Sequence, residues 1–160
     1  MTPATHSRKI DAAVYIPVLR QLMDEGRQVP LTITGNSMSP FLIHERDKII
    51  ISAVDRPLKK GDMAFFKRWN GQYIMHRVYR VAPDGSYYFV GDAQTNVEGP
   101  IAPEQIFGLI VAVERKGKRE HPGTFWWEFF EHFWLYARPI RPVLWGLYRR
   151  LFNRHKQAED

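Results

Sequence analysis

Ser37 and His76 are the two side chains in this chain whose types and surroundings best suit covalent chemistry. Residues 35–40 read Gly-Asn-Ser-Met-Ser-Pro, which places Ser37 on a tight turn, and His76 lies inside the strand-like run 73–78, Tyr-Ile-Met-His-Arg-Val. A serine hydroxyl is a poor nucleophile until a base removes its proton, and imidazole titrates close enough to neutral pH to accept that proton. The pair therefore predicts nucleophilic attack by Ser37 with His76 as the general base.

Each of these residues has a simpler structural interpretation when it is taken alone. Gly-Asn-Ser is an ordinary turn sequence, and a single histidine in a strand more often supports the fold than reacts. Gly35 favours the nucleophile because it allows a strained backbone just before Ser37, and Pro40 fixes the chain just after it. Lys60 and Lys67 are weaker candidates for the base, because both flank the strand that precedes the histidine.

Two carboxylates follow the histidine and could complete a triad. Asp92 belongs to the sequence Gly-Asp-Ala-Gln at residues 91–94, and Glu98 follows shortly after it. A carboxylate can orient a neutral histidine and stabilise the imidazolium that forms during catalysis. We expect Asp92 to hold the site together and keep Glu98 as its rival for orienting His76. The structural alternative is that Gly91 and Asp92 cap a turn, since both residue types are common in turns.

The chain divides into three regions: an N-terminal helical segment at 1–29, a β core at 30–120 and a tail at 121–160. Helical spacing of apolar residues predicts one helix in the first region. Pro17 suggests that its firm part begins near that residue, and Gly26 is a plausible stop. The apolar residues at this spacing are Ile10, Val14, Val18 and Leu22.

Residues 30–120 contain short runs of Ile, Val, Phe and Tyr that are separated by turn residues, which is typical of strands. Asn70-Gly71 and Asp84-Gly85 predict two successive hairpins. With a single helix ahead of it, this pattern favours a mainly β fold with a barrel-like core. The predicted strands are Leu31–Thr34, Lys48–Val54, Met63–Lys67, Tyr73–Val81, Ser86–Val90 and Ile106–Glu114.

The tail at 121–160 is aromatic and basic. It holds eleven of the 22 aromatic residues, and from Arg138 to Lys156 it has six Lys or Arg residues and no Asp or Glu. Its apolar spacing is helical, and Pro139 and Pro142 are expected to divide it into two helices. Residues 124–156 suit an anionic membrane surface, with the rings at headgroup level. Packing on the β core and binding to a protein partner are the two alternatives.

The composition excludes several classes of function. The net charge is +6 and there is no cysteine, so the chain has no disulfide, thiol nucleophile or thiolate zinc site. There is no glycine-rich phosphate loop, and the basic tail carries no nucleic-acid-binding motif, so we expect neither a cofactor nor a nucleic-acid partner. No metal is expected either, because no metal-ligand spacing joins His6, His44, His121, His132 and His155.

The chain has no apolar run long enough to span a membrane, and its N-terminus lacks the apolar core of a secretory signal. We therefore expect a cytoplasmic or peripherally membrane-associated protein.

Taken in order along the chain, these motifs resemble the signal peptidase I family of serine endopeptidases, in the LexA/signal peptidase superfamily. The matching features are Ser-Met-x-Pro beginning at Ser37, Lys-Gly-Asp at 60–62, His-Arg-Val at 76–78 and the box at 91–94, with Glu98 at the place of the family's second acid. Bacterial members of that family use a lysine base, whereas archaeal and endoplasmic-reticulum members have a histidine there. This chain is similar to the Ser/His branch over residues 30–114.

The resemblance implies a signal-peptidase-like β-barrel core and cleavage of an extended signal or leader peptide after small residues, without a cofactor. The backbone N–H of Ser37 would be the first oxyanion donor. Many family members have a hydroxyl side chain two residues earlier, where this chain has Gly35, so Asn36 or another backbone N–H would have to act as the second donor.

Two alternatives to this enzyme stay open. One is a LexA-type self-cleaving regulator, although the chain has no Ala-Gly bond and residues 1–29 are too short for a DNA-binding domain. The other is a non-catalytic module that holds a peptide while the tail docks on a membrane. Gly35 and Ala93, which depart from the family pattern, favour that second alternative.

Overall fold

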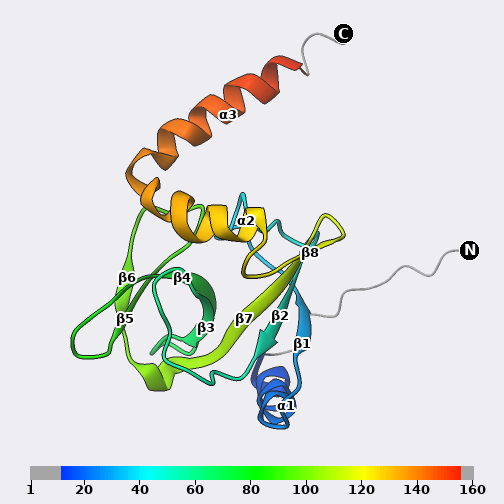
Figure 1. Ribbon diagram of the computed structural model, residues 1–160, viewed down its shortest axis with the longest axis vertical. Coiled ribbons are helices and arrows are strands. Elements are labelled where there is room, and N and C mark those ends of the chain that lie inside the picture. The colour runs from blue at the N-terminus through cyan, green and yellow to red at the C-terminus, as the bar shows by residue number, and fades with distance from the viewer. Residues whose placement is uncertain (1–11, 156–160) are drawn as a thin grey trace, which may run out of the picture.

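The computed structural model describes residues 12–155, which form one antiparallel sheet with helices at opposite ends (Figure 1). Within these residues there are eight strands, in the order β1-β2-β7-β3-β4-β5-β6, with β8 paired to β7. Their bounds are β1 Val29–Thr32, β2 Lys48–Ser52, β3 Met63–Lys67, β4 Tyr73–Val81, β5 Tyr87–Val90, β6 Glu98–Ile101, β7 Ile106–Arg115 and β8 Lys118–Glu120.

The mainly β fold predicted from the sequence is confirmed, and the sheet is not closed into a complete barrel. Both predicted hairpins are present, β3 with β4 and β4 with β5. The Gly71 turn has φ +87°, the left-handed region that glycine adopts without strain. In the second turn, Asp84 accepts hydrogen bonds from the backbone N–H and the hydroxyl of Ser86 at 2.9 and 2.6 Å.

Four points of the strand predictions need correction. β6 and β8 are absent from the predicted set, β1 begins and ends two residues before the predicted Leu31–Thr34, and β2 ends two residues before the predicted Val54. The Ile33 N–H still donates to the Asp47 carbonyl in the register of β1 and β2, but the Ile33 carbonyl accepts from the Glu45 N–H at 2.8 Å, and the ladder ends there. β6 reads Glu-Gly-Pro-Ile and β8 reads Lys-Arg-Glu, so neither has the β-branched or aromatic run that marks a strand.

The N-terminal helix α1 runs from Ala12 to Asp24. Pro17 lies inside it and not at its start, which corrects the sequence-based boundary, while Ile10 lies outside the described residues. One face of α1 packs under the sheet, and this burial stabilises the helix despite the proline. Gly26 ends it as predicted, with φ +77°. The side chains buried between α1 and the sheet are Ile16, Leu19, Met23, Ile51 and Phe107.

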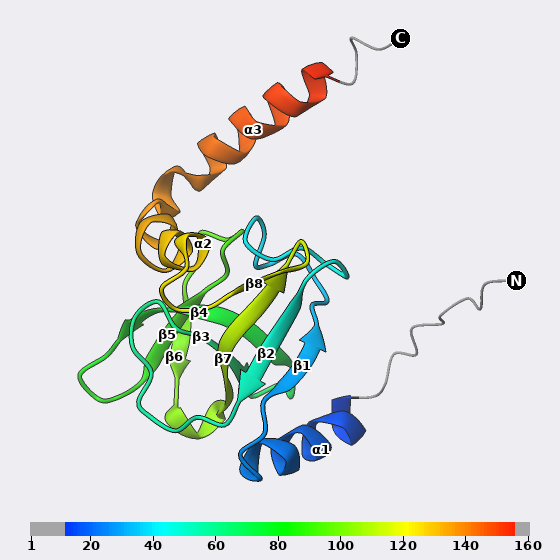
Figure 2. The ribbon, with the colours of Figure 1, turned by 45° about the vertical axis from the view of Figure 1, so that its right-hand side comes forward.

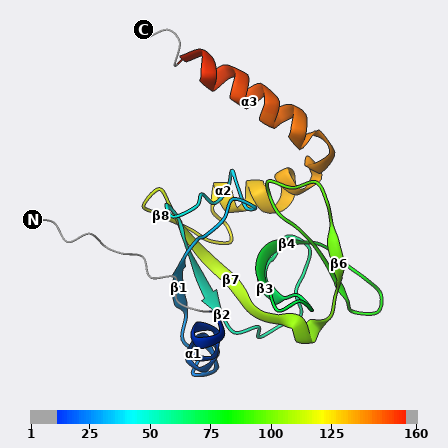
Figure 3. The ribbon, with the colours of Figure 1, turned by 180° about the vertical axis from the view of Figure 1, so that it is seen from behind.

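The tail begins with α2 (Phe125–Glu128), which continues as the π-helix η2 (Phe129–Trp134) across the opposite end of the sheet from α1 (Figure 3). Trp127 and Phe130 pack against Phe41, with ring centroids 6.3 and 4.7 Å away. Packing on the core, one of the alternatives for the tail, therefore describes this first part.

A short 3-10 turn, η3 (Arg138–Ile140), leads from η2 into α3 (Arg141–His155), which extends away from the sheet (Figure 2). The break near Pro139 is confirmed. Pro142 does not interrupt a helix, because it lies in the first turn of α3, where the missing N–H costs no hydrogen bond. None of the described helices is both long enough and apolar enough to cross a membrane.

Candidate functional site

Ser37 lies on a turn that is anchored from below by buried apolar side chains. Met38, Phe41 and Leu42 are all nearly inaccessible, whereas Ser37 itself is only half-buried. The Leu42 N–H donates to the Met38 carbonyl at 2.9 Å, which closes the turn. Gly35, just before it, has φ +91°, so the backbone adopts the conformation that the sequence analysis expected ahead of a nucleophile. The turn therefore holds the Ser37 backbone firmly.

The backbone of Ser37 packs directly on the segment that carries the first acid. The Ala93 N–H donates to the Ser37 carbonyl at 2.9 Å, and a Cβ placed on Gly91 would lie 2.6 Å from the same oxygen. Only glycine permits this close approach.

The sheet register brings His76 to the same place. Arg77 on β4 pairs with Val90 on β5, and continuing that register by one residue sets His76 opposite Gly91. Residues opposite each other on antiparallel strands project to the same face. From this register we infer that the His76 side chain lies on the face where the Ser37 turn packs over Gly91. Within residues 12–155 no hydrogen bond joins the Ser37 hydroxyl to His76, and such catalytic bonds are often long without substrate.

His76 is almost fully buried, with 3% of its surface exposed, and its Nδ1 has no hydrogen-bond partner. Burial lowers the pKa of His76 to about 4, because the charged imidazolium loses its hydration; the charge of Glu98 raises this pKa and that of Arg68 lowers it. The imidazole is therefore neutral at pH 7, which is the protonation state that a general base requires.

Asp92 is committed to a buried ion pair with Arg77. Both side chains are inaccessible, and Arg77 donates from Nε and Nη2 to the two carboxylate oxygens at 3.0 and 2.9 Å. Arg77 also donates from Nη1 to the Gly61 carbonyl at 3.0 Å. Because its oxygens are held by Arg77, Asp92 connects β4 to the segment after β5, which is an architectural position.

Glu98, at the start of β6, is the carboxylate nearest to His76. Its Oε2 lies 3.9 Å from Nδ1 of His76, beyond hydrogen-bond distance. Arg68 holds the same carboxylate in a bidentate pair, in which Nη2 donates to Oε2 at 2.7 Å and Nε donates to Oε1. Gln72 in turn accepts from Nη1 of Arg68 at 2.9 Å. Arg68 and His76 therefore face one carboxylate from two sides.

The tail fixes the loop that follows Asp92. The Trp134 indole N–H donates to the Asp92 carbonyl at 2.8 Å, and Arg138 donates to the Thr95 carbonyl at 2.7 Å. Arg141 donates from Nη1 to the Gly91 and Gln94 carbonyls at 2.9 and 2.7 Å. These bonds connect residues 91–95 to helices that follow far later in the chain.

A pocket of about 850 Å³ opens between this loop, Ser39 and Pro40 of the turn after Ser37, and the tail; neither Ser37 nor His76 lines it. Its volume is in the range of sites that hold a small molecule or a few peptide residues. Glu98 and Arg68 lie on its wall, which is otherwise a mixture of polar loop residues and apolar side chains. The apolar part is formed by Pro40, Ala93, Val97, Trp134, Pro142 and Trp145.

The two alternative lysine bases lie against aromatic rings. The Lys60 Nζ is 4.1 Å from the ring centroid of Tyr136, and the Lys67 Nζ is 5.5 Å from that of Tyr73. These cation–π contacts give both ammonium groups a role on the surface.

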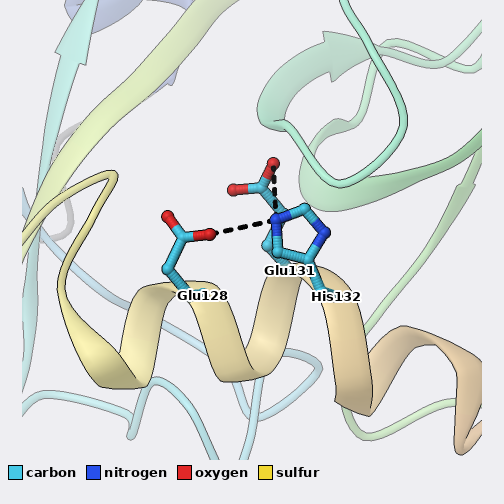
Figure 4. A group of neighbouring side chains, drawn as sticks. All are labelled: Glu128, Glu131 and His132. Atoms are coloured by element: carbon cyan, nitrogen blue, oxygen red, sulfur yellow. Dashed lines mark ion pairs between the residues drawn. The ribbon is translucent and has the colours of Figure 1, made fainter.

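One group of side chains in the tail has the composition of a metal site. Glu128, Glu131 and His132 bring ligand-type atoms within 4.8 Å of one another (Figure 4). Ion pairs account for the group: Nε2 of His132 lies 3.0 Å from Glu128, and buried Glu131 accepts from the Trp127 indole N–H at 2.9 Å and faces Lys59 at 3.5 Å. We assign no metal to it.

Arg68 and Arg77 are the two site residues that the sequence analysis missed. Arg77 belongs to the His-Arg-Val motif, but the motif alone does not indicate that this arginine pairs with Asp92. Arg68 has no such signal, because it follows β3 in a hairpin and its partner Glu98 lies in a strand that was not predicted.

Residues 3–111 match the family model described as Peptidase S24-like. This match covers more than half of the chain, and the chain belongs to that peptidase family. Membership is consistent with the LexA/signal peptidase superfamily and indicates a serine peptidase or a LexA-like self-cleaving protein. No curated protein and no solved structure matches the chain. The tail at 121–160 lies outside the matched residues.

Proposed function

We propose that this chain is a serine endopeptidase in which Ser37 forms an acyl-enzyme with a peptide substrate and His76 is the general base. The observation that carries the proposal is a buried, neutral imidazole on the face where the Ser37 turn packs over Gly91. A structural histidine would have both ring nitrogens engaged, whereas Nδ1 of His76 has no partner and faces a carboxylate.

The geometry supports an assignment of the two imidazole nitrogens. Because Nδ1 faces Glu98, Nε2 is left for the Ser37 hydroxyl. As the Ser37 oxygen bonds to the scissile carbonyl carbon, its proton passes to Nε2, and the tetrahedral intermediate then expels the amine, which takes that proton. A water that gives its proton to Nε2 next attacks the resulting ester, and the second tetrahedral intermediate releases the acid product as Nε2 returns that proton to the Ser37 oxygen.

Two donors are available for the oxyanion. The backbone N–H of Ser37 makes no hydrogen bond within residues 12–155, and the exposed Asn36 side chain is adjacent to it. Donors of this kind stabilise the charge that develops on the carbonyl oxygen. The Asn36 side-chain amide can supply the second hydrogen-bond donor, which Gly35 cannot supply because it has no side chain.

Glu98 is the acid that we assign to His76, and Arg68 is its positioning residue. When His76 becomes positively charged, the carboxylate 3.9 Å away stabilises it, while the nearby guanidinium opposes it. Asp92 keeps the architectural role, because Arg77 occupies both of its oxygens.

An extended peptide is the substrate class that this site supports. β6 is an end strand of the sheet, and a peptide can add to a free strand edge through its backbone. The pocket of about 850 Å³ lies beside Glu98 at the start of that strand. Cleavage after small residues of a signal or leader peptide follows the resemblance to signal peptidase I.

The test is labelling with a fluorophosphonate probe, which bonds to activated serines, followed by intact mass measurement. We expect one adduct on the wild-type protein and none on Ser37→Ala or His76→Ala. Ser39→Ala is the matched control, because it removes the other hydroxyl of the same turn and should keep the adduct. A folded wild-type protein that takes no adduct would contradict the proposal and favour the non-catalytic peptide-binding module. Fragments of the chain itself in the same spectra would indicate self-cleavage.

A further inference from the structure

The outer surface of the tail exposes large apolar side chains to an unusual degree. Ten of the fourteen exposed large hydrophobic residues among those described lie between 125 and 148. Scattered exposed apolar residues are normal on a soluble protein, but a concentration of this kind marks an interaction surface. These residues therefore need a partner that the sheet does not provide.

Part of this surface is an aromatic ladder on α2 and η2, formed by Phe125, Phe129 and Phe133. Consecutive rings of the ladder stack, with centroids 6.3 and 5.3 Å apart. Phe125 is 72% exposed and Phe133 is 66% exposed, while Trp127 and Phe130 on the opposite side of the same helix are buried in the core. The helix therefore has two apolar faces, and only one of them is used by the fold.

The helix α3 extends away from the sheet (Figure 2), and its exposed apolar side chains continue this surface. Among the residues of α3 whose exposure the structure describes, Val143 and Leu147 are the most exposed large apolar ones, at 71% and 55%. They lie four residues apart and so on one side of the helix.

The charges on α3 are positive, whereas the helix of the ladder carries Glu128 and Glu131, which lie 3.0 Å from His132 and 3.5 Å from Lys59. From Arg138 to Lys156 the sequence has six basic residues and no acidic one, and Arg150 is exposed on α3. Beside the ladder, the Lys60 Nζ lies 4.1 Å from the Tyr136 ring centroid, and the Arg115 guanidinium lies 4.9 Å from the Trp126 ring. Apolar and aromatic side chains bordered by cations fit the interface of an anionic bilayer.

We propose that the aromatic ladder and the apolar side of α3 form a docking surface for an anionic lipid bilayer. The inference rests on exposure and charge alone and does not depend on Ser37 or His76 being catalytic. Tryptophan, tyrosine and phenylalanine rings would enter the headgroup region, and the cations would face the lipid phosphates.

The test is sedimentation of the full chain with vesicles of phosphatidylcholine alone or of phosphatidylcholine with phosphatidylglycerol. We expect binding to the anionic vesicles to be about tenfold tighter or more, and to weaken with added salt. The double variant Phe125→Ser/Phe133→Ser should lose this binding. Trp69→Ser, which removes an 87% exposed aromatic from the β3–β4 hairpin, is the matched control and should bind like the wild type.

A second variant pair protects the test against loss of folding. Val143→Ser/Leu147→Ser changes only α3, which extends beyond the sheet, and should also weaken binding while the thermal unfolding of the core is retained. Equal binding to both kinds of vesicle, or no binding, would overturn the proposal. So would a dimer, detected by light scattering, that is abolished by Phe125→Ser/Phe133→Ser, because a second copy would then cover the surface.

Discussion

Acidification should destabilise this protein through His76 in a way that can be separated from every other titrating group. Folding lowers the pKa of His76 to about 4, whereas an unfolded histidine titrates near 6.5. The unfolded chain therefore binds the proton more readily than the native one. The stabilisation is complete above about pH 6.5 and is lost as the pH falls towards 4.

The size of the effect follows from the two pKa values. Between pH 7.5 and pH 4.5, protonation of the unfolded chain at His76 should lower the free energy of unfolding by about 2.5 kcal/mol. Carboxylates add their own dependence over this range, so the useful quantity is a difference between variants. The variant His76→Gln has no titrating group at this position. Its free energy of unfolding should therefore fall by about 2.5 kcal/mol less than that of wild type over the same pH range.

Urea unfolding of both proteins at the two pH values measures this difference. The difference in the free energy of unfolding between wild type and variant at a single pH does not enter this comparison, because the buried glutamine alters packing by the same amount at both pH values. His121→Gln, at an exposed histidine, is the control and should keep the wild-type pH dependence. If wild type and His76→Gln lose the same stability on acidification, the imidazole is not held neutral by burial and the argument for a poised base fails.

Three further predictions concern the charged side chains around the histidine. Asp92→Asn should lower the free energy of unfolding by about 3–5 kcal/mol, because Arg77 would keep a buried charge without a partner; a urea midpoint close to that of wild type would contradict this. Glu98→Gln should leave stability nearly unchanged, since this side chain is partly exposed, but should reduce the second-order rate of probe labelling roughly 100-fold or more. Arg68→Gln should raise the pKa of His76, because Arg68 lowers it, so the labelling rate should fall at a higher pH on acidification than in wild type; an unchanged pH profile would show that Arg68 does not act through Glu98 and His76.

The strands that could be predicted are those with their own local signals. β3 and β4 agree with the predicted bounds because each is a run of apolar and aromatic residues and the turn between them contains Asn-Gly. β6 could not be predicted, because it contains a glycine and a proline and is defined only by its pairing with β5. The missed strand carries Glu98, so the sequence could name this residue as a candidate acid without placing it.

The tail shows the same limit for helices. Spacing predicted a helix through Trp126, Phe130 and Phe133, and a helix is present, but Trp126 and Phe133 are exposed while Trp127 is buried. The π-helix η2 adds a residue to its turn and rotates the later side chains away from the face that the usual helical period would choose. The buried side chains Trp127 and Phe130 pack against Phe41, a contact distant in the sequence that no local pattern encodes.

The hydrogen bonds from Trp134, Arg138 and Arg141 to residues 91–95 have a thermodynamic consequence. They connect a loop inside the family match to helices that lie outside it. If the loop and these helices shift together, any ligand of the tail changes the affinity for peptide at the site, and peptide must change the affinity of the tail for its ligand by the same factor. Binding at the tail would then change binding at the peptide site, and the reverse. Removal of the tail would abolish this coupling together with the hydrogen bonds that hold residues 91–95.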